Sequence, residues 1–488
     1  MPAYIRKKEL KNGTTVVQVE YRHGQKRTGF EHIGTAHNEV ELAFLYAAAK
    51  EIKFKGQLSF DFGQQSIPRA KLLKTCSELL WNTLGDVYNS LGFSFIDDDV
   101  FRQLVLTRII EPASKLDTIR ILNGLGVDAP SNTSIHRCLR RIIDDRYRDI
   151  ISNICFKHCS ASSLTFVLYD VTTLYFETDK EDGYRIPGLS KERRLEPQIT
   201  VGLLVNSFGY PLEIKSFEGN KAEVKTIIPV LNSFKNRHGL TNITVVADAA
   251  MISAKNIEQL EGFGYNYIIG SKLSKTPYDI DIQLDNGVVF TDTQIFDIIK
   301  TLILNSKYVE RREIFQYKQK RASLDLLNIN KTIVKAQKFI SGEANIKRNR
   351  FLKVSGDKRE LNLELIEEAK KRAGIKGYIT NLDIPPQQVI DAYHQLFRIE
   401  KAFRMSKSDL KARPVFHRKK DSIEAHLTIV FAALALSCHI EAKTGISIKK
   451  FVRTLEPVRS GVVSVEKHVF PIEADIADNI VEILKKLA

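Results

Sequence analysis

The pattern of apolar and polar positions changes several times along the 488 residues, and each change predicts a separate region. Residues 14–21 (TTVVQVEY) alternate with the period of a strand, directly after the turn signal Asn12-Gly13. A second basic arm follows at 23–34, and the Ala-rich run 39–53 has the composition of a helix. We therefore predict a small unit of basic β-hairpin and helix at residues 1–60.

Helical spacing replaces this alternation at residues 61–160, where short apolar segments are separated by Gly or Pro. The run 71–92 (KLLKTCSELLWNTLGDVYNSLG) is predicted to be helical, and 129–145 (APSNTSIHRCLRRIIDD) predicts a helix with Ser134 as a possible N-cap. Short basic helices joined by tight turns are compatible with a helix-turn-helix reader of DNA and equally with an ordinary helical bundle. The pattern leaves both interpretations open.

Residues 161–272 contain β-branched and aromatic runs that predict strands. A central strand at 163–176 is followed by a hairpin, and helices then alternate with strands. Residues 376–445 belong with them and include an apolar run that is short for a membrane span and predicts a buried core helix. Together the two parts predict an α/β fold, a mixed sheet flanked by helices.

The remaining regions differ from this core. Residues 273–375 are basic, strand-rich in places and poor in obvious core helices, so we predict an inserted subdomain there. Residues 446–488 predict a C-terminal region of two short helices with a strand between them. A chain of this length is too long for a single core, which agrees with several regions.

The charge balance suits a polyanionic partner. A total of 73 Lys and Arg against 58 Asp and Glu gives a formal net charge of +15 and a pI near 9.3. Basic clusters with interleaved aromatics, as around Tyr317, Phe351 and Phe416, are typical of surfaces that bind phosphates and bases. Each cluster alone is also typical of a solvated surface. Nucleic acid is the expected partner, with the helical region 61–160 contributing to its binding by charge and position.

Cysteine usage and the N-terminal segment indicate the compartment. Five cysteines are too few, and odd in number, for a disulfide framework. Cys155, His158 and Cys159 lie close together, but their spacing matches no common zinc pattern and is typical of a buried helical turn. The N-terminal segment lacks the apolar stretch of a signal peptide. We expect a reduced, cytoplasmic protein without a membrane partner.

The segment 393–407 (YHQLFRIEKAFRMSK) carries the most informative polar pattern. Tyr393, Glu400 and Lys407 recur at steps of seven residues. On an α-helix that step drifts by only ~20° per repeat, so the three side chains are predicted to share one face. A phenol, a carboxylate and an ammonium make a poor core and a plausible site. Apolar neighbours are expected to anchor the helix elsewhere, namely Phe397, Ile399, Phe403, Met405 and Leu410.

Two predicted strands supply carboxylates that can meet Glu400. Asp170 closes or interrupts the strand LTFVLYD, and Asp248 closes the strand ITVVAD. A carboxylate directly after an apolar strand is costly unless it is paired, exposed or bound to a cation, and strand ends are where α/β folds place their sites. Three convergent carboxylates without a nearby histidine favour Mg²⁺ or Mn²⁺ as the bound metal ion. Two such ions about 4 Å apart support phosphoryl transfer.

These residues lie in motifs that resemble the DDE transposases of bacterial insertion sequences, in the IS-four superfamily. The matching motifs are YDVTTLYFE around Asp170, GLSKERRLEPQ (188–198), FEGNKAE (217–223), VVADAAMIS around Asp248, and a Tyr-Arg-Glu-Lys signature at 393–407. The resemblance covers roughly residues 160–440 and implies an RNase H-like core. It also implies an insertion between the second Asp and the Glu, which agrees with the separation of 152 residues between Asp248 and Glu400.

The resemblance also implies what the chain does and with which partners. A metal-dependent DNA transposase cleaves transposon ends and joins the freed 3′-hydroxyl to target DNA. Asp170, Asp248 and Glu400 are then the catalytic residues and the ligands of Mg²⁺ or Mn²⁺, with two ions expected. The partners are double-stranded DNA, at the transposon ends and the target, and a second copy of the chain, as a homodimer on DNA at the bacterial nucleoid.

The Tyr-Arg-Glu-Lys signature implies DNA-binding roles and contains one departure. Tyr393 and Lys407 occupy matching places and are implied to contact DNA phosphates near the active site. Leu396 stands where the family has an arginine, and we expect Arg398 or Arg404 to take over its phosphate contact.

Three alternatives remain open from the sequence. A nuclease of the same fold would hydrolyse DNA without joining, but would not obviously need the N-terminal, helical and inserted regions. A transposase-derived DNA-binding regulator would have lost the chemistry, which the intact carboxylates argue against. Tyr393 could alternatively act as a nucleophile instead of contacting a DNA phosphate, although metal chemistry makes a protein-linked intermediate unnecessary.

Overall fold

The computed structural model divides the chain into two compact units. One comprises Met1–Ala70 with Val465–Lys467, and the other comprises Lys71–Ser464 with His468–Ala488. The described residues are all except 1–2, 11–12, 25, 55–69, 161–165, 179, 189–194, 250–252, 272–277, 287, 305–306, 344–348, 356–357, 466–467 and 488. Parts of two predicted motifs, residues 189–194 and 250–252, therefore lie outside the described residues.

The N-terminal unit is a three-stranded antiparallel sheet covered by one helix. Its elements are β1 (Ala3–Glu9), β2 (Thr15–His23), β3 (Lys26–Ala36) and α1 (Glu39–Phe54). Val17, Val19 and Ala49 form a small core between sheet and helix. The predicted hairpin is present as β2 and β3 and the predicted helix as α1, while β1 is an additional strand.

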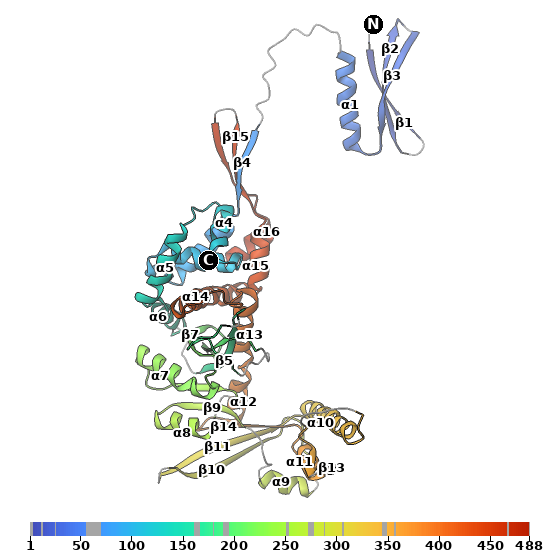
Figure 1. Cartoon of the computed structure of the whole chain (residues 1–488). Coiled ribbons are helices and arrows are strands. Elements are labelled where there is room, and N and C mark those ends of the chain that lie inside the picture. The colour runs from blue at the N-terminus through green and yellow to red at the C-terminus, as the bar shows by residue number, and fades with distance from the viewer. Residues whose placement is uncertain are drawn as a thin grey trace. The chain divides into compact units, whose positions relative to one another are not determined.

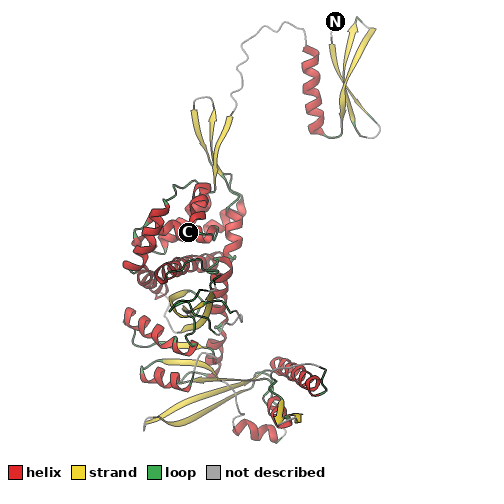
Figure 2. Ribbon diagram, in the orientation of Figure 1, coloured by secondary structure: helices red, strands yellow, loops and turns green. Residues whose placement is uncertain are grey.

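The central sheet of the larger unit has eight strands. They are β5 (Val167–Tyr175), β6 (Gln198–Asn206), β7 (Pro211–Glu218), β8 (Thr244–Ala247), β9 (Asn266–Ser271), β10 (Ile295–Leu304), β11 (Lys307–Tyr317) and β14 (Ile375–Thr380). Their order is β10-β11-β14-β9-β8-β5-β6-β7. Strands β5, β6 and β7 pair antiparallel, whereas β8 pairs parallel with both β5 and β9. This mixed sheet with helices against it is the predicted α/β, RNase H-like arrangement (Figure 2).

The segment between β9 and β14 extends this sheet by two strands and also contains a small two-stranded sheet of its own. Strands β10 and β11 continue the sheet beyond β14, in antiparallel pairing. The same segment contains α9 (Tyr278–Asp285), α10 (Gln319–Ile340), the strand pair β12 (Leu352–Ser355) and β13 (Lys358–Leu361), and α11 (Leu363–Lys371). Helix α10 has 22 residues, and the sequence pattern did not reveal it because it buries few positions, namely Ala322, Ile329 and Ala336. Ile329, Phe351, Ile366 and Ala369 form a core of their own beside it.

The helical region packs onto the sheet through one long helix, α14 (Lys420–Thr444), and through its own last helix. Its members are α2 (Glu78–Ser90), α3 (Asp99–Ile110), α4 (Lys115–Leu125), α5 (Asn132–Asp144) and α6 (Tyr147–Ser160). Helix α14 contacts α3, α5 and α6 of the helical region and also β7 of the sheet. Figure 1 shows it between α5 and β7. It is apolar and long enough to cross a membrane, but 83% of its most apolar window is buried inside the protein. The predicted core helix is therefore α14, and one hydrophobic core runs from the helical region into the sheet.

Two local predictions in the helical region are wrong. Helix α5 begins three residues earlier than expected, and its N-cap is Ser131, whose Oγ accepts a hydrogen bond from the Ser134 backbone N–H at 3.1 Å. Both serines suit the cap, and the structure uses the first. Residues 70–76, expected to be helical, form strand β4 (Ala70–Cys76).

Strand β4 has partners that are remote in sequence. It pairs in the order β16-β15-β4 with β15 (Ser460–Val465) and β16 (His468–Ile472), after α15 (Ile448–Leu455) and before α16 (Asp478–Lys485). Its side chains from 70 to 75 are all exposed, so no buried face gave the sequence a strand signature. A pairing partner almost 400 residues away decides the conformation instead.

Candidate active site

Two aspartates stand side by side on neighbouring parallel strands. Tyr169 of β5 is paired with Ala247 of β8, and the next residue on each strand is an aspartate, Asp170 and Asp248. Parallel strands lie about 4.8 Å apart, so the register brings the two carboxylates to equivalent positions. Asp170 lies within β5, whose following residues pair only with β6, and Asp248 directly follows the last residue of β8. The prediction of two strand-borne aspartates on one sheet is confirmed.

The carboxylate of Glu400 comes from a helix that is broken on both sides. Helix α12 (Pro386–His394) ends before α13 (Phe397–Arg404) begins, and a turn of π-helix (Met405–Asp409) follows. At the first junction the bonds tighten to the i→i+3 type, with the N–H of Leu396 donating to Tyr393 O at 3.1 Å. The prediction of one continuous helix through Tyr393, Glu400 and Lys407 is wrong, because these local departures interrupt the seven-residue period.

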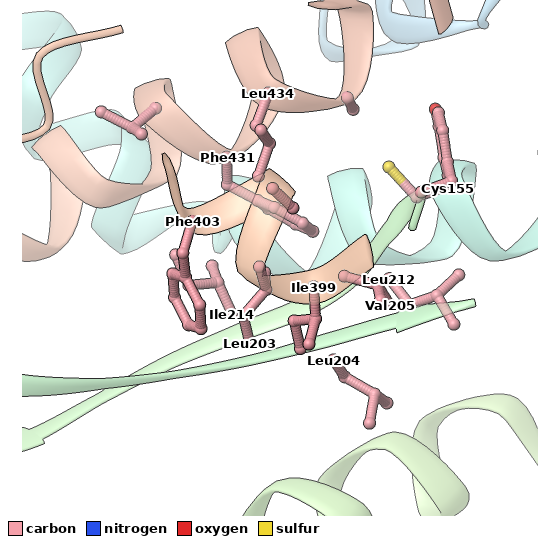
Figure 3. Close-up of a cluster of buried hydrophobic side chains, with 14 of the residues drawn as sticks. Cys155, Leu203, Leu204, Val205, Leu212, Ile214, Ile399, Phe403, Phe431 and Leu434 are labelled. Carbon is pink, nitrogen blue, oxygen red and sulfur yellow. The ribbon is translucent and has the colours of Figure 1, made fainter. Parts of the chain in front are cut away.

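Helix α13 is fixed by its apolar side. Ile399 and Phe403 are buried, and Figure 3 shows them on the side of α13 that faces the strands of the sheet. Phe431 and Leu434 of α14 lie beyond the same helix (Figure 3). Met405 and Leu410 are also buried, but Phe397 is 59% exposed and does not serve as the expected anchor. The buried pair holds Glu400, which is exposed, beside the sheet.

The three carboxylates line a common cavity despite their distance in sequence. A cavity of about 300 Å³ is lined by Asp170, Asp248 and Glu400, together with Tyr393 and Lys376 among others. A second hollow of about 380 Å³ shares Asp170 and Glu400 with it. Three cationic side chains line this second hollow, Arg404, Lys407 and Arg413. Carboxylates that share a hollow with cations suit a site for a divalent ion and a polyanion.

Tyr393 holds one of the aspartates. Its hydroxyl donates a hydrogen bond to Asp248 Oδ1 at 2.8 Å, and the residue is only 6% exposed. Burial, followed by the bond to Asp248, raises the pKa of Tyr393 above its ordinary value. The Lys376 ammonium lies 4.2 Å from the centre of the Tyr393 ring. A buried phenol that donates to a carboxylate is a poor nucleophile, which argues against the covalent alternative.

The position expected for an arginine and its two expected substitutes lie in different surroundings. Leu396 lines the carboxylate cavity and packs against the hydrophobic core, so the place expected for an arginine is apolar here. Arg398 lies over the rings of Phe208 and Phe397 and lines a different hollow, one that contains none of the three carboxylates. Of the two expected substitutes, Arg404 lines the hollow beside Asp170 and Glu400.

The comparison with protein families decides the identity of this fold and site. The transposase DDE domain matches residues 161–436, which is more than half of the chain. The chain belongs to the DDE transposase family. No curated protein matches it. Among solved structures it is similar to a piggyBac transposase synaptic complex with hairpin DNA, determined by cryo-electron microscopy, at 11% identity and a TM-score of 0.37. That similarity covers 78% of this chain and 70% of the other.

The donor set of this transposase suits an oxygen-loving divalent ion. Asp170, Asp248 and Glu400 offer only carboxylate oxygens, the ligand type that Mg²⁺ and Mn²⁺ prefer. The expectation that no histidine lies nearby is wrong, because His394 also lines the cavity. Within the described part of the chain, however, no three acidic, histidine or cysteine side chains are close enough together to hold an ion as they stand. The chemistry of the three donors nevertheless fits such an ion.

Two residues of the transposase site were not found by sequence reasoning. Lys376, at the start of β14, lies at the carboxylate cavity, where burial and then the nearby Arg321 lower its pKa. A lysine inside an apolar strand is costly, and that cost was the available signal. Arg413 lies in the second hollow and follows the π-helical turn, where no periodic pattern points to it.

Two of the motifs that resemble the transposase family, 188–198 in its described part and 217–223, have a structural role and contact each other. The Gly219 backbone oxygen accepts a hydrogen bond from Gln198 Nε2 at 3.0 Å, and the Gly219 N–H donates to Tyr184 O at 3.2 Å. A Cβ at Gly219 would lie 2.0 Å from the Gln198 backbone oxygen, and one at Gly188 would lie 2.3 Å from Gly219 O. These glycines permit close backbone approach at the entrance to β6, the strand that pairs with the one carrying Asp170.

Proposed function

We propose that the protein is a DNA transposase of the IS-four superfamily, which cleaves transposon ends and joins the freed 3′-hydroxyl to target DNA. The observation that carries this proposal is the shared cavity of Asp170, Asp248 and Glu400. Three separate elements of the fold bring these residues together across 230 positions of sequence, within the family-matched segment.

Each side chain of the site has a proposed task. Tyr393 orients Asp248 through its hydrogen bond, so that one carboxylate oxygen remains directed to the cavity. Arg404 and Lys407 contact DNA phosphates along the second hollow, and neutralise charge next to the carboxylates. When bound by the three carboxylates, two Mg²⁺ or Mn²⁺ ions supply activation of a hydroxyl and stabilisation of the leaving oxygen.

The substrate is proposed to be double-stranded DNA, bound by a homodimer that brings two ends together. The excess of basic residues, with a net charge of +15, supports a polyanionic partner. Light scattering of the protein alone and with end duplex tests the stoichiometry: two chains on two ends support the dimer, and one chain on each separate end contradicts it.

The decisive experiment is cleavage of a labelled end duplex with Mg²⁺. Short inverted repeats flanking the reading frame supply the duplex sequence. Asp170→Asn, Asp248→Asn and Glu400→Gln should each abolish cleavage, because each removes a carboxylate charge from the cavity. Asp391→Asn is the matched control: Asp391 is exposed on α12 and outside the cavity, and its loss should leave cleavage unchanged.

The products separate the competing functions. Joining of the cut 3′ end to a second duplex supports a transposase, whereas cut ends without joined product support a nuclease. Tight binding of the end without any cleavage supports a regulator. Cleavage at the wild-type rate by all three carboxylate variants would show that the site is elsewhere.

A further inference from the structure

A large pocket lies outside the carboxylate cavity. It has a volume of about 720 Å³ and is bounded by α3, α4 and α5 of the helical region, by residues 411–417 and by α14. This volume falls within the ~300–1,000 Å³ typical of pockets for small molecules. None of Asp170, Asp248 and Glu400 lines it. We call it the basic pocket.

Its charge is of one sign. Arg108 of α3, only 7% exposed, and Lys115 of α4 line it, and the described residues of its wall include no Asp or Glu. Throughout the described part of the chain, neither Arg108 nor Lys115 makes an ion pair. Burial lowers the pKa of Arg108 to about 10, and burial together with Arg108 lowers the pKa of Lys115. A buried cation without an ion-pair partner, such as Arg108, is costly, and Lys115 beside it is half-buried. An anionic ligand would therefore stabilise the arrangement.

A buried histidine also lines the pocket, and one of its two ring nitrogens is unpaired among the described residues. His426 of α14 is 4% exposed, and its Nε2 lies 3.3 Å from the backbone oxygen of Ala412. Its other ring nitrogen, Nδ1, is buried and has no hydrogen-bond partner among the residues that the structure describes. Because Nε2 faces an acceptor, Nδ1 carries no proton in the neutral ring, and it gains one when an anion binds beside it. Buried polar atoms without partners are rare in folded proteins, and this one lines a pocket of ligand size.

Two further features of the basic pocket fit a nucleotide better than a bare anion. The first residues of α4 and α5, Lys115 and Asn132, both line the pocket, so two helix N-termini meet there. Its wall also contains apolar side chains, including Leu116, Leu139 and Pro414. Phe416 is 72% exposed at the same pocket, where an aromatic face can stack on a base.

We propose that the basic pocket binds one phosphate-bearing nucleotide group, with the phosphate against Arg108 and Lys115 and the base against Phe416. The group belongs either to a DNA strand or to a free nucleotide. Arg413 lines both the basic pocket and the hollow beside Asp170 and Glu400, so a strand that passes the carboxylates can reach the pocket. Binding in the pocket does not require catalysis, and the proposal stands or falls independently of the transposase activity.

Isothermal titration of the full chain with dAMP, inorganic phosphate and a short 5′-phosphorylated oligonucleotide tests the proposal. Lys115→Met should weaken dAMP binding about tenfold, the loss of one charge-assisted hydrogen bond. Arg120→Met is the matched control, because it removes the same charge from the same helix. Arg120 does not line the pocket. This control substitution should change the affinity less than twofold.

Phe416→Ala keeps the test valid if the Lys115 variant does not fold, since Phe416 is a surface residue. It should weaken dAMP severalfold and leave inorganic phosphate unchanged. Tighter binding of the oligonucleotide than of dAMP, lost in Lys115→Met, identifies a DNA strand as the ligand, whereas equal or tighter binding of dAMP identifies a free nucleotide. No binding of any probe at millimolar concentration, or equal losses in Lys115→Met and Arg120→Met, overturns the proposal.

Discussion

The hydrogen bond between Tyr393 and Asp248 can be broken by a substitution at a third residue, while both partners keep their identity. A Cβ at Gly270 of β9 would lie 2.6 Å from Tyr393 Oη and 3.1 Å from two ring carbons. Ordinary contact needs about 3.5 Å, so Gly270→Ala displaces the hydroxyl by roughly 0.9 Å. The hydroxyl now lies 2.8 Å from Asp248 Oδ1, and a displacement of that size weakens or breaks the bond.

The size of the effect follows from the type of bond. A hydrogen bond to a charged group contributes about 1.5–3 kcal/mol. If the bond orients Asp248 for cleavage, its loss slows single-turnover cleavage by about tenfold to about a hundredfold. Tyr393→Phe should cause a similar loss, and the double variant should lose little more than either, because both changes remove the same interaction. Gly262→Ala is the matched control, since a Cβ there meets no atom within 4 Å.

Stability must be measured beside activity, because an added methyl in a packed region costs about 1–3 kcal/mol. Cleavage should be assayed well below the melting temperature of each variant, as determined by circular dichroism. Wild-type cleavage by Gly270→Ala, or losses that add fully in the double variant, would refute the role of Tyr393 as a positioning residue for Asp248.

Three other predictions concern binding and stability. Lys407→Ala should lower the log–log slope of DNA affinity against salt by about one unit, and an unchanged slope would place Lys407 off the DNA. Asp98→Ala should lower the free energy of unfolding by about 1–3 kcal/mol, because Asp98 caps α3 and accepts hydrogen bonds from Arg141 and Tyr147, while Asp99→Ala should change it little. Stability should fall as the pH drops from about 6.5 to about 4, by at most about 1.4 kcal/mol per pH unit for each histidine concerned, since the unfolded chain takes up protons that the folded one excludes. Burial lowers the pKa to about 4 in His238, His417 and His439. Urea unfolding at several pH values measures this, and a flat profile contradicts it.

Local chemistry made much of the core predictable. The strands that carry Asp170 and Asp248 are short apolar runs, and a carboxylate at such a place stands out in a sequence. Glu400 could be predicted as the third member because its apolar neighbours Ile399 and Phe403 fix the face that it occupies. The same pattern did not predict the breaks around α13, because a junction of the i→i+3 type and a π-helical turn cost little and leave no mark in hydrophobic spacing.

The features that sequence reasoning missed depend on remote partners. Strand β4 has no buried face of its own, and β10 and β11 belong to the core sheet only because β14 returns beside β9. Lys376 reaches the carboxylate cavity by the same route, from a strand at the end of the inserted segment. These strand pairings join segments that are remote in sequence, so no local pattern of apolar and polar residues indicates them.

The pairing of β4 with β15 leaves β4 without its partner strand while the chain is being synthesised. The strand that leads into the helical region is made early, but its partner emerges only after more than 380 further residues. Until then β4 presents an open edge with Leu72 and Leu73 exposed, which invites pairing with other nascent chains. A product truncated before residue 460 never closes that edge. Premature termination would therefore yield an association-prone species, in addition to a shorter one.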